Sequence, residues 1–144
     1  MQTRDQQYAI DVYQKATRVK QKFAEKDVKV YGSMCHKLPI LIHTAGLVQA
    51  LTFVDTREKS KTPDGPQTRD DKEKPLQRLL KDLAGTILKD SKEKLLERAR
   101  QADLQEYMLL TQQVLDALLW YKRFAQSVLD VEDASKADEV IKDE

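Results

Sequence analysis

The chain has 144 residues, with 25 lysines and arginines against 24 aspartates and glutamates, for a formal net charge of +1. This length fits one domain that can bury a core without disulfides. The single cysteine, Cys35, excludes a disulfide within the chain. Only four glycines and four prolines occur, and no window alternates with period two. The polar start after Met1 has no signal-peptide pattern. We therefore expect an all-α, cytoplasmic protein, a single-domain bundle of about five to six helices.

The charge is unevenly distributed along the sequence. Residues 130–144 contain seven acidic and two basic side chains, for a net charge of −5, and the remaining body has a net charge of +6. A basic body with an acidic tail permits a polyanionic partner, but a solvated surface with a solubilising tail explains the same pattern.

The first expected helix opens with Thr3 and Gln6, which form a capping-box pattern. An apolar stripe follows, and a second, basic stripe lies beside it at helical spacing. This helix is expected to end near Lys29, with a turn at residues 31–33. The basic stripe is either a phosphate-binding face or the ordinary charged surface of a bundle helix, and it consists of Arg4, Lys15, Arg18, Lys22 and Lys26.

Two long segments, 39–56 and 104–129, have apolar residues on nearly every side of a helical wheel. A helix without a polar side belongs in the middle of a bundle, so these two are predicted to be the most buried helices and to touch. Pro39 is expected to open the first of them after a short turn at 33–37, and Gly46, inside it, to permit close approach of another helix.

The region between these segments divides into a polar loop and two shorter helices. The loop, 56–75, has almost no apolar side chain, and residues 55–75 contain six bases and six acids, which is typical of a mobile segment. Pro75 suits the first position of a helix whose apolar face runs to Ile87. Asp90 with Glu93 and Asp103 with Glu106 are expected to cap the next two helices. The helical bundle thus spans 1–130, and the acidic tail, 131–144, is expected to be frayed or disordered.

Few side chains suggest catalysis. The sequence contains no glycine-rich phosphate loop, no nucleophile elbow and no cluster of cysteines and histidines with metal-ligand spacing. Cys35, His36 and His43 could form a thin metal site or a cysteine enzyme site, but capping or core roles are more common for such residues. We expect no catalytic residue, no metal and no cofactor, and hence an interaction protein.

Near the end of the second apolar segment, Lys122 and Arg123 follow Trp120 and Tyr121. Bases beside aromatic rings can pair and stack with nucleic acid. The same pattern also arises from core aromatic residues at the end of a helix, where cations complement the helix dipole.

Several motifs taken together resemble the small helical subunit of the type III-B CRISPR effector, the Cmr complex. Their order and spacing make the resemblance more specific than any one motif does, and it covers residues 2–54 and 76–129. The motifs are QTRDQ at 2–6, YGS at 31–33, HKLP at 36–39, GL at 46–47, QAL at 49–51, EYM at 106–108 and LWYKRFA at 119–125.

This resemblance implies an all-α subunit without catalytic activity. Several copies would stack beside the backbone subunits that carry the guide RNA, contact the large subunit, and line the groove where target RNA pairs with the guide. The matched positions with phosphate-binding side chains are Arg4, Lys37, Lys122 and Arg123, whereas Lys15, Arg18 and Lys22 come from periodicity alone. The alternatives are a helical adaptor that binds only protein and the cysteine or metal enzyme described above.

Overall fold

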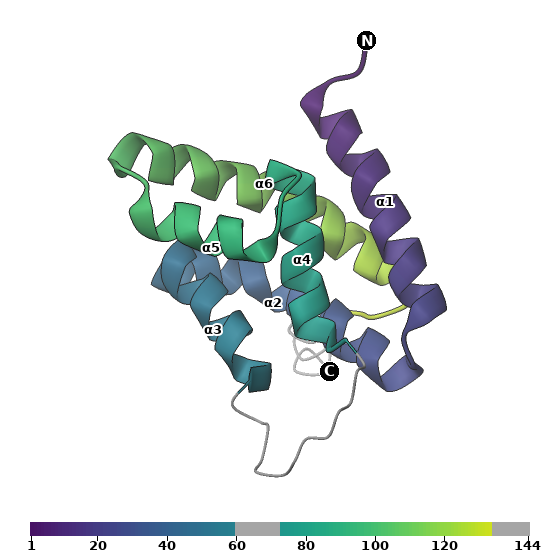
Figure 1. Cartoon of the computed structure of the whole chain (residues 1–144). Coiled ribbons are helices and arrows are strands. Elements are labelled where there is room, and N and C mark those ends of the chain that lie inside the picture. The colour runs from purple at the N-terminus through teal and green to yellow at the C-terminus, as the bar shows by residue number, and fades with distance from the viewer. Residues whose placement is uncertain (60–72, 134–144) are drawn as a thin grey trace, which may run out of the picture.

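Six helices make up the part of the chain that the computed structural model describes, residues 1–59 and 73–133 (Figure 1). No strand occurs among these residues, so the all-α fold class is confirmed there. The described residues also include no helix long and apolar enough to cross a membrane. The helices are α1 (Arg4–Lys22), α2 (Glu25–Ala45), α3 (Leu47–Lys59), α4 (Pro75–Leu88), α5 (Lys92–Gln101) and α6 (Leu104–Ser127).

The helix at the centre of the bundle is α4, which contacts each of the other five helices. Figure 1 shows it between α1 on one side and α3 and α5 on the other. Nine of its 14 residues are buried, compared with six of the 24 residues of α6. The prediction that 39–56 and 104–129 would be the two most buried helices is therefore wrong.

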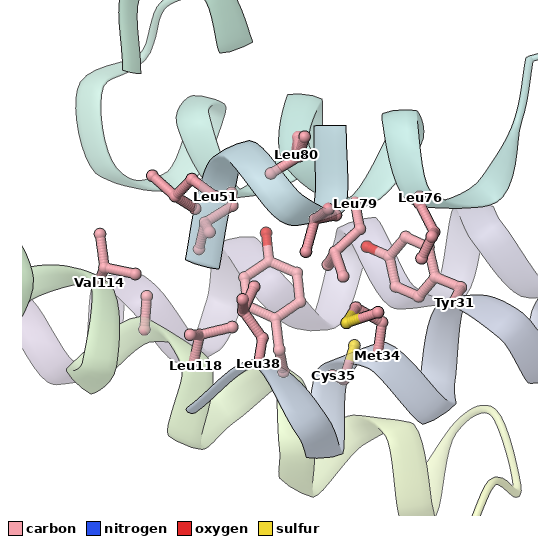
Figure 2. Close-up of a cluster of buried hydrophobic side chains, with 14 of the residues drawn as sticks. Tyr31, Met34, Cys35, Leu38, Leu51, Leu76, Leu79, Leu80, Val114 and Leu118 are labelled. Carbon is pink, nitrogen blue, oxygen red and sulfur yellow. The ribbon is translucent and has the colours of Figure 1, made fainter. Parts of the chain in front are cut away.

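The apolar face predicted after Pro75 forms the middle of the core. Pro75 occupies the first turn of α4, and Leu76, Leu79, Leu80 and Leu83 are all buried, as the spacing predicted. In Figure 2 the first three of these leucines lie opposite side chains of α2. The α2 residues on the facing side are Tyr31, Met34, Cys35 and Leu38.

The first two helices divide at a different place from the one predicted. The capping box of Thr3 and Gln6 is present, but α1 ends at Lys22 and α2 already begins at Glu25. The predicted turn at 31–33 lies inside α2. Gly32 is buried there because the segment after α6 packs against it, and a Cβ on Gly32 would come within 2.6 Å of Val131. This glycine serves close packing instead of a turn.

The predicted helix 39–56 is divided by Gly46. Pro39 lies inside α2 instead of opening a helix, so burial of the α2 face outweighs the loss of one backbone donor. Gly46 has a φ of 91° and terminates α2, because this left-handed backbone favours glycine. The segment does not bury every apolar side either, since Ile40 and Phe53 are about half exposed, at 55% and 48%.

The second apolar segment forms one helix with a clear outer face. Asp103 caps α6 by accepting a hydrogen bond from the amide of Glu106, as predicted. The cap of α5 is Ser91, not Asp90. Leu118 is fully buried, and α6 packs against α1, α2 and α4. Four large apolar residues on the same helix are exposed, namely Leu104, Met108, Leu109 and Leu119.

Two predictions about irregular segments are partly corrected. Residues 56–59 of the predicted loop belong to α3, and 60–72 lie outside the described residues. The expected fraying of the tail is wrong for its first residues, because Val131 and Asp133 are buried and the carbonyl of Val131 lies 2.8 Å from His36 Nε2. Residues 134–144 lie outside the described part of the chain.

Candidate nucleic-acid interface

The basic stripe on α1 is largely neutralised by acidic neighbours. Lys15 binds Asp11 at 2.7 Å, and its side chain is only 15% exposed. Lys22 binds Glu73, just before α4, at 3.2 Å. Arg18 is exposed and has no ion-pair partner among residues 1–59 and 73–133. Two of the three lysines and arginines inferred from periodicity are therefore already engaged within the bundle.

Three more of the predicted residues lie on α6 or pair with it. Arg4 binds Asp116 at 2.5 Å, and Lys122 lies 3.6 Å from the carboxylate of Asp133. The guanidinium of Arg123 lies over the ring of Trp120, at 5.9 Å from its centroid. Arg123 thus remains exposed and without an acidic partner in the described residues, whereas Arg4 and Lys122 are paired.

The aromatic residues beside Lys122 and Arg123 divide between core and surface. Tyr121 is buried and exchanges a hydrogen bond of 2.8 Å with Thr86. Trp120 is half-buried, stacks on Phe124, and donates its Nε1–H to Asp5 at 2.9 Å. The core interpretation therefore holds for Tyr121, and the indole N–H of Trp120 is already used in joining α6 to α1.

The seventh predicted residue, Lys37, lines a surface cavity of about 470 Å³ between α2, the end of α3 and the start of α4. Sequence reasoning missed this site because Lys26 and Lys29 were assigned to the end of α1. Once α2 begins at Glu25, Lys26, Lys29, Ser33 and Lys37 fall within about 80° on one helix face. The cationic residues of the lining are Lys26, Lys29, Lys37, Arg57 and Lys74, and the acidic ones are Asp27 and Glu58.

The carboxylate of Glu58 in this lining is committed to the start of α4. It accepts hydrogen bonds from the backbone amides of Leu76, at 3.1 Å, and Gln77, at 3.2 Å. These amides lack partners within their own helix, so Glu58 caps α4 from another helix and is buried as a result. Five cations and two carboxylates leave the lining with a net formal charge of +3.

The three residues of the possible enzyme site, Cys35, His36 and His43, lie in different environments and do not form a common site. Cys35 is buried, and burial raises the pKa of its thiol well above the ordinary value, so little reactive thiolate forms. His36 is buried and bonded to the carbonyl of Val131, whereas His43 is exposed in the last turn of α2. Within residues 1–59 and 73–133, no group of three or more His, Cys, Asp or Glu could hold a metal ion.

A polar network inside the core joins α2 and α4. Tyr31 donates a hydrogen bond of 2.6 Å to Asp82, and Arg78 Nε donates one of 3.0 Å to the same carboxylate. Burial raises the pKa of Asp82 even though both hydrogen bonds oppose the shift. Burial, together with the charge of Asp82, also raises the pKa of Tyr31. Because these groups satisfy one another inside the bundle, they specify its packing.

Comparison with known proteins agrees with the fold and with the sequence motifs. The family model for a CRISPR-associated protein (Cas_Cmr5) matches residues 4–128. The chain is 38% identical over 130 residues to the CRISPR system Cmr subunit Cmr5 of Thermus thermophilus, covering 90% of this chain and 99% of that one. It also resembles the crystal structure of a CRISPR-associated Cmr5 family protein from the same organism, with a TM-score of 0.71 and 36% identity, covering 89% of this chain and 98% of the other. The chain therefore belongs to the Cmr5 family of CRISPR-associated proteins.

Proposed function

We propose that this chain is the non-catalytic small subunit of a type III-B CRISPR effector, the Cmr complex, acting in cytoplasmic antiviral defence. The observation that carries the proposal is the family match over residues 4–128. The T. thermophilus relative is by name a Cmr subunit, and the two chains correspond over almost all of their lengths. In this role the chain stacks in several copies beside the backbone subunits, contacts the large subunit, and helps to hold guide and target RNA.

The state of the candidate catalytic groups supports a subunit without an activity of its own. The Cys35 thiol is enclosed in the core, and the Nε2 of His36 is engaged with the main chain at Val131. A nucleophile and its base must contact each other and be accessible to a substrate. Cys35 and His36 are both buried, and the histidine is bonded to the main chain instead of to the thiol.

The outer face of α6 supports contact with neighbouring subunits. Leu104, Met108 and Leu119 fall within about 60° on this helix, and they are exposed by 74%, 62% and 56%. Large exposed apolar side chains grouped on one face are typical of protein-binding surfaces. A subunit that packs between other subunits would cover them.

Affinity purification of the tagged chain, expressed together with the other Cmr subunits and a guide RNA, tests the proposal. We expect the guide RNA and the partner subunits to co-purify, and target-RNA binding to fall when this chain is omitted from the reconstituted complex. Co-purification of protein without any change in RNA binding on omission would favour the alternative, a helical adaptor with no nucleic-acid role.

A further inference from the structure

We propose that the cavity between α2, α3 and α4 binds the phosphate backbone of RNA, and that Lys26, Lys29 and Lys37 are its principal ligands. The proposal deepens the RNA-holding role proposed above and rests on it. It moves the RNA contact from the α1 stripe, which periodicity suggested, to a face of α2 where the tertiary structure joins Lys37, which the family motifs suggested, with Lys26 and Lys29.

The three lysines differ from the other predicted contacts in their surroundings. Lys15, Lys22, Arg4 and Lys122 each have a carboxylate within 4 Å. Lys26, Lys29 and Lys37 are exposed and have no ion-pair partner in the described part of the chain. Within the described residues, a phosphate would displace no carboxylate from these ammonium groups, so no ion pair among those residues is lost on binding.

The geometry of α2 keeps these charges together. Its core face, which includes Val28, Tyr31 and Leu38, is buried, and the lysine face points away from it. From Lys26 to Lys37 the helix rises about 16 Å. The lysines therefore form a ridge long enough to contact more than one phosphate of an extended strand.

The opposite wall of the cavity adds a further lysine, and its one carboxylate is already hydrogen-bonded to the backbone amides of α4. Lys74 lies at the start of α4, where its Nζ donates to the backbone carbonyl of Glu58 at 3.3 Å. The carboxylate of Glu58 is occupied by the amides of α4, which leaves Asp27 as the other acid of the lining. Asp27 lies in the first turn of α2, where the helix dipole favours a carboxylate.

The lining suits a backbone ligand better than a base. Among the described residues, the lining has no aromatic side chain for stacking and no Asn or Gln to read a base edge, and four of its five cations are lysines, with Arg57 the fifth. Lysines act on phosphates as point charges, which gives binding without sequence preference. A single subunit with a site of this kind binds weakly, and several stacked copies would act together on one RNA.

The test is a triple substitution, Lys26→Gln, Lys29→Gln and Lys37→Gln, in the chain assembled into the reconstituted Cmr complex. Target-RNA affinity is measured between about 50 and 200 mM salt, and ultraviolet crosslinking with mass spectrometry locates the RNA. We expect the variant complex to bind target RNA more weakly than the wild type at low salt. Raising the salt over this range should also reduce its affinity by a factor up to about 20 times smaller than the factor for the wild type, because three phosphate contacts are missing. In the wild-type complex, crosslinks should fall on peptides containing residues 26–37.

The matched control is Lys89→Gln, Lys94→Gln and Arg100→Gln, which removes the same charge from exposed positions outside the cavity. An equal loss of RNA affinity in both variants would overturn the cavity proposal and leave general charge attraction as the explanation.

Normal RNA binding by the α2 variant, with loss of a neighbouring subunit from the complex, would also overturn the cavity proposal and identify an acidic protein surface as the ligand. Omission of the whole chain without any effect on RNA binding would instead refute the proposed function. Unchanged melting of the isolated variant checks that the fold is intact.

Discussion

Gly32 of α2 lies so close to Val131 that a Cβ at position 32 would come within 2.6 Å of Val131 Cβ. The two residues are 99 positions apart, and their contact holds the segment after α6 against α2. The carbonyl oxygen of Val131 lies 2.8 Å from His36 Nε2 in the neighbouring turn, and because a carbonyl can only accept, the Nε2–H donates this hydrogen bond. This contact explains both the buried glycine inside a helix and the ordered start of the acidic tail.

Replacing Gly32 by Ala should therefore destabilise the protein, although alanine is the better helix former. We expect a loss of about 1–3 kcal/mol from overpacking, measured by urea unfolding. Gly85→Ala is the control, because its added Cβ would meet only the flexible end of Lys15, at 3.4 Å. There we expect no loss, or a gain of up to about 1 kcal/mol. Equal stability of the two variants would show that Val131 moves aside without cost.

Truncation of the tail should give different results at two positions. Ending the chain after Asp133 retains the Val131 contact and should leave the unfolding free energy unchanged. Ending it after Leu129 removes a buried valine and its hydrogen bond with His36, and we expect a loss of about 1–3 kcal/mol. Chemical denaturation of both truncated proteins distinguishes these results. Similar stability of both would show that the contact contributes nothing.

Neighbouring leucines on α6 provide a paired test of the core. Leu118 is fully buried and Leu119 is 56% exposed. Leu118→Ala should cost about 2–5 kcal/mol because it leaves a cavity among packed side chains. Leu119→Ala should change the stability of the isolated chain by less than about 0.5 kcal/mol. A small effect at Leu118 in thermal or denaturant unfolding would contradict the packing described for this side of the bundle.

Lys15 and Arg18 lie on the same predicted stripe and should behave differently. Lys15 forms an ion pair with Asp11 and its side chain is only 15% exposed, so Lys15→Ala should destabilise the fold by about 1 kcal/mol through the lost pair and the lost packing of the stem. Arg18 is exposed and unpaired among the described residues, so Arg18→Ala should change stability by less than about 0.5 kcal/mol. Unfolding curves of the two single variants are sufficient to test this. A harmless Lys15→Ala substitution would return Lys15 to the set of available RNA contacts.

The ion cluster around Glu73 predicts a specific dependence of stability on pH. Burial opposes ionisation, but hydrogen bonds from Lys22 and Arg78 prevail and lower the pKa of Glu73 below its ordinary value of 4.5. A carboxyl group whose pKa is lower in the folded state stabilises the fold above its unfolded pKa and loses this contribution as pH falls through the folded pKa. The stability difference between the wild type and Glu73→Gln should therefore shrink as pH is lowered below about 4.5. A difference independent of pH in that range would exclude the proposed contribution.

Patterns of local origin were predicted well from the sequence. The capping box of Thr3 and Gln6, the Asp103 cap and the apolar face of α4 from Leu76 to Leu83 all appear as expected. Each depends on side chains within a few turns of one another, because helix periodicity and capping are short-range effects. The motif order along the chain likewise predicted the family that the comparisons show.

Helix boundaries and charge pairing depended on contacts between distant residues. Gly32 and Pro39 are residue types that usually end or interrupt a helix. Packing against Val131 and burial of the α2 core face keep both of them inside one helix. Arg4 is neutralised by Asp116, and Lys22 by Glu73, over separations of 112 and 51 residues. Helical periodicity places a lysine on a face, but it contains no information about which carboxylate lies opposite that face. The sequence by itself therefore determined the helical fold class and the family, and only the tertiary structure decided which lysines have no ion-pair partner among the described residues and so are offered to an RNA phosphate.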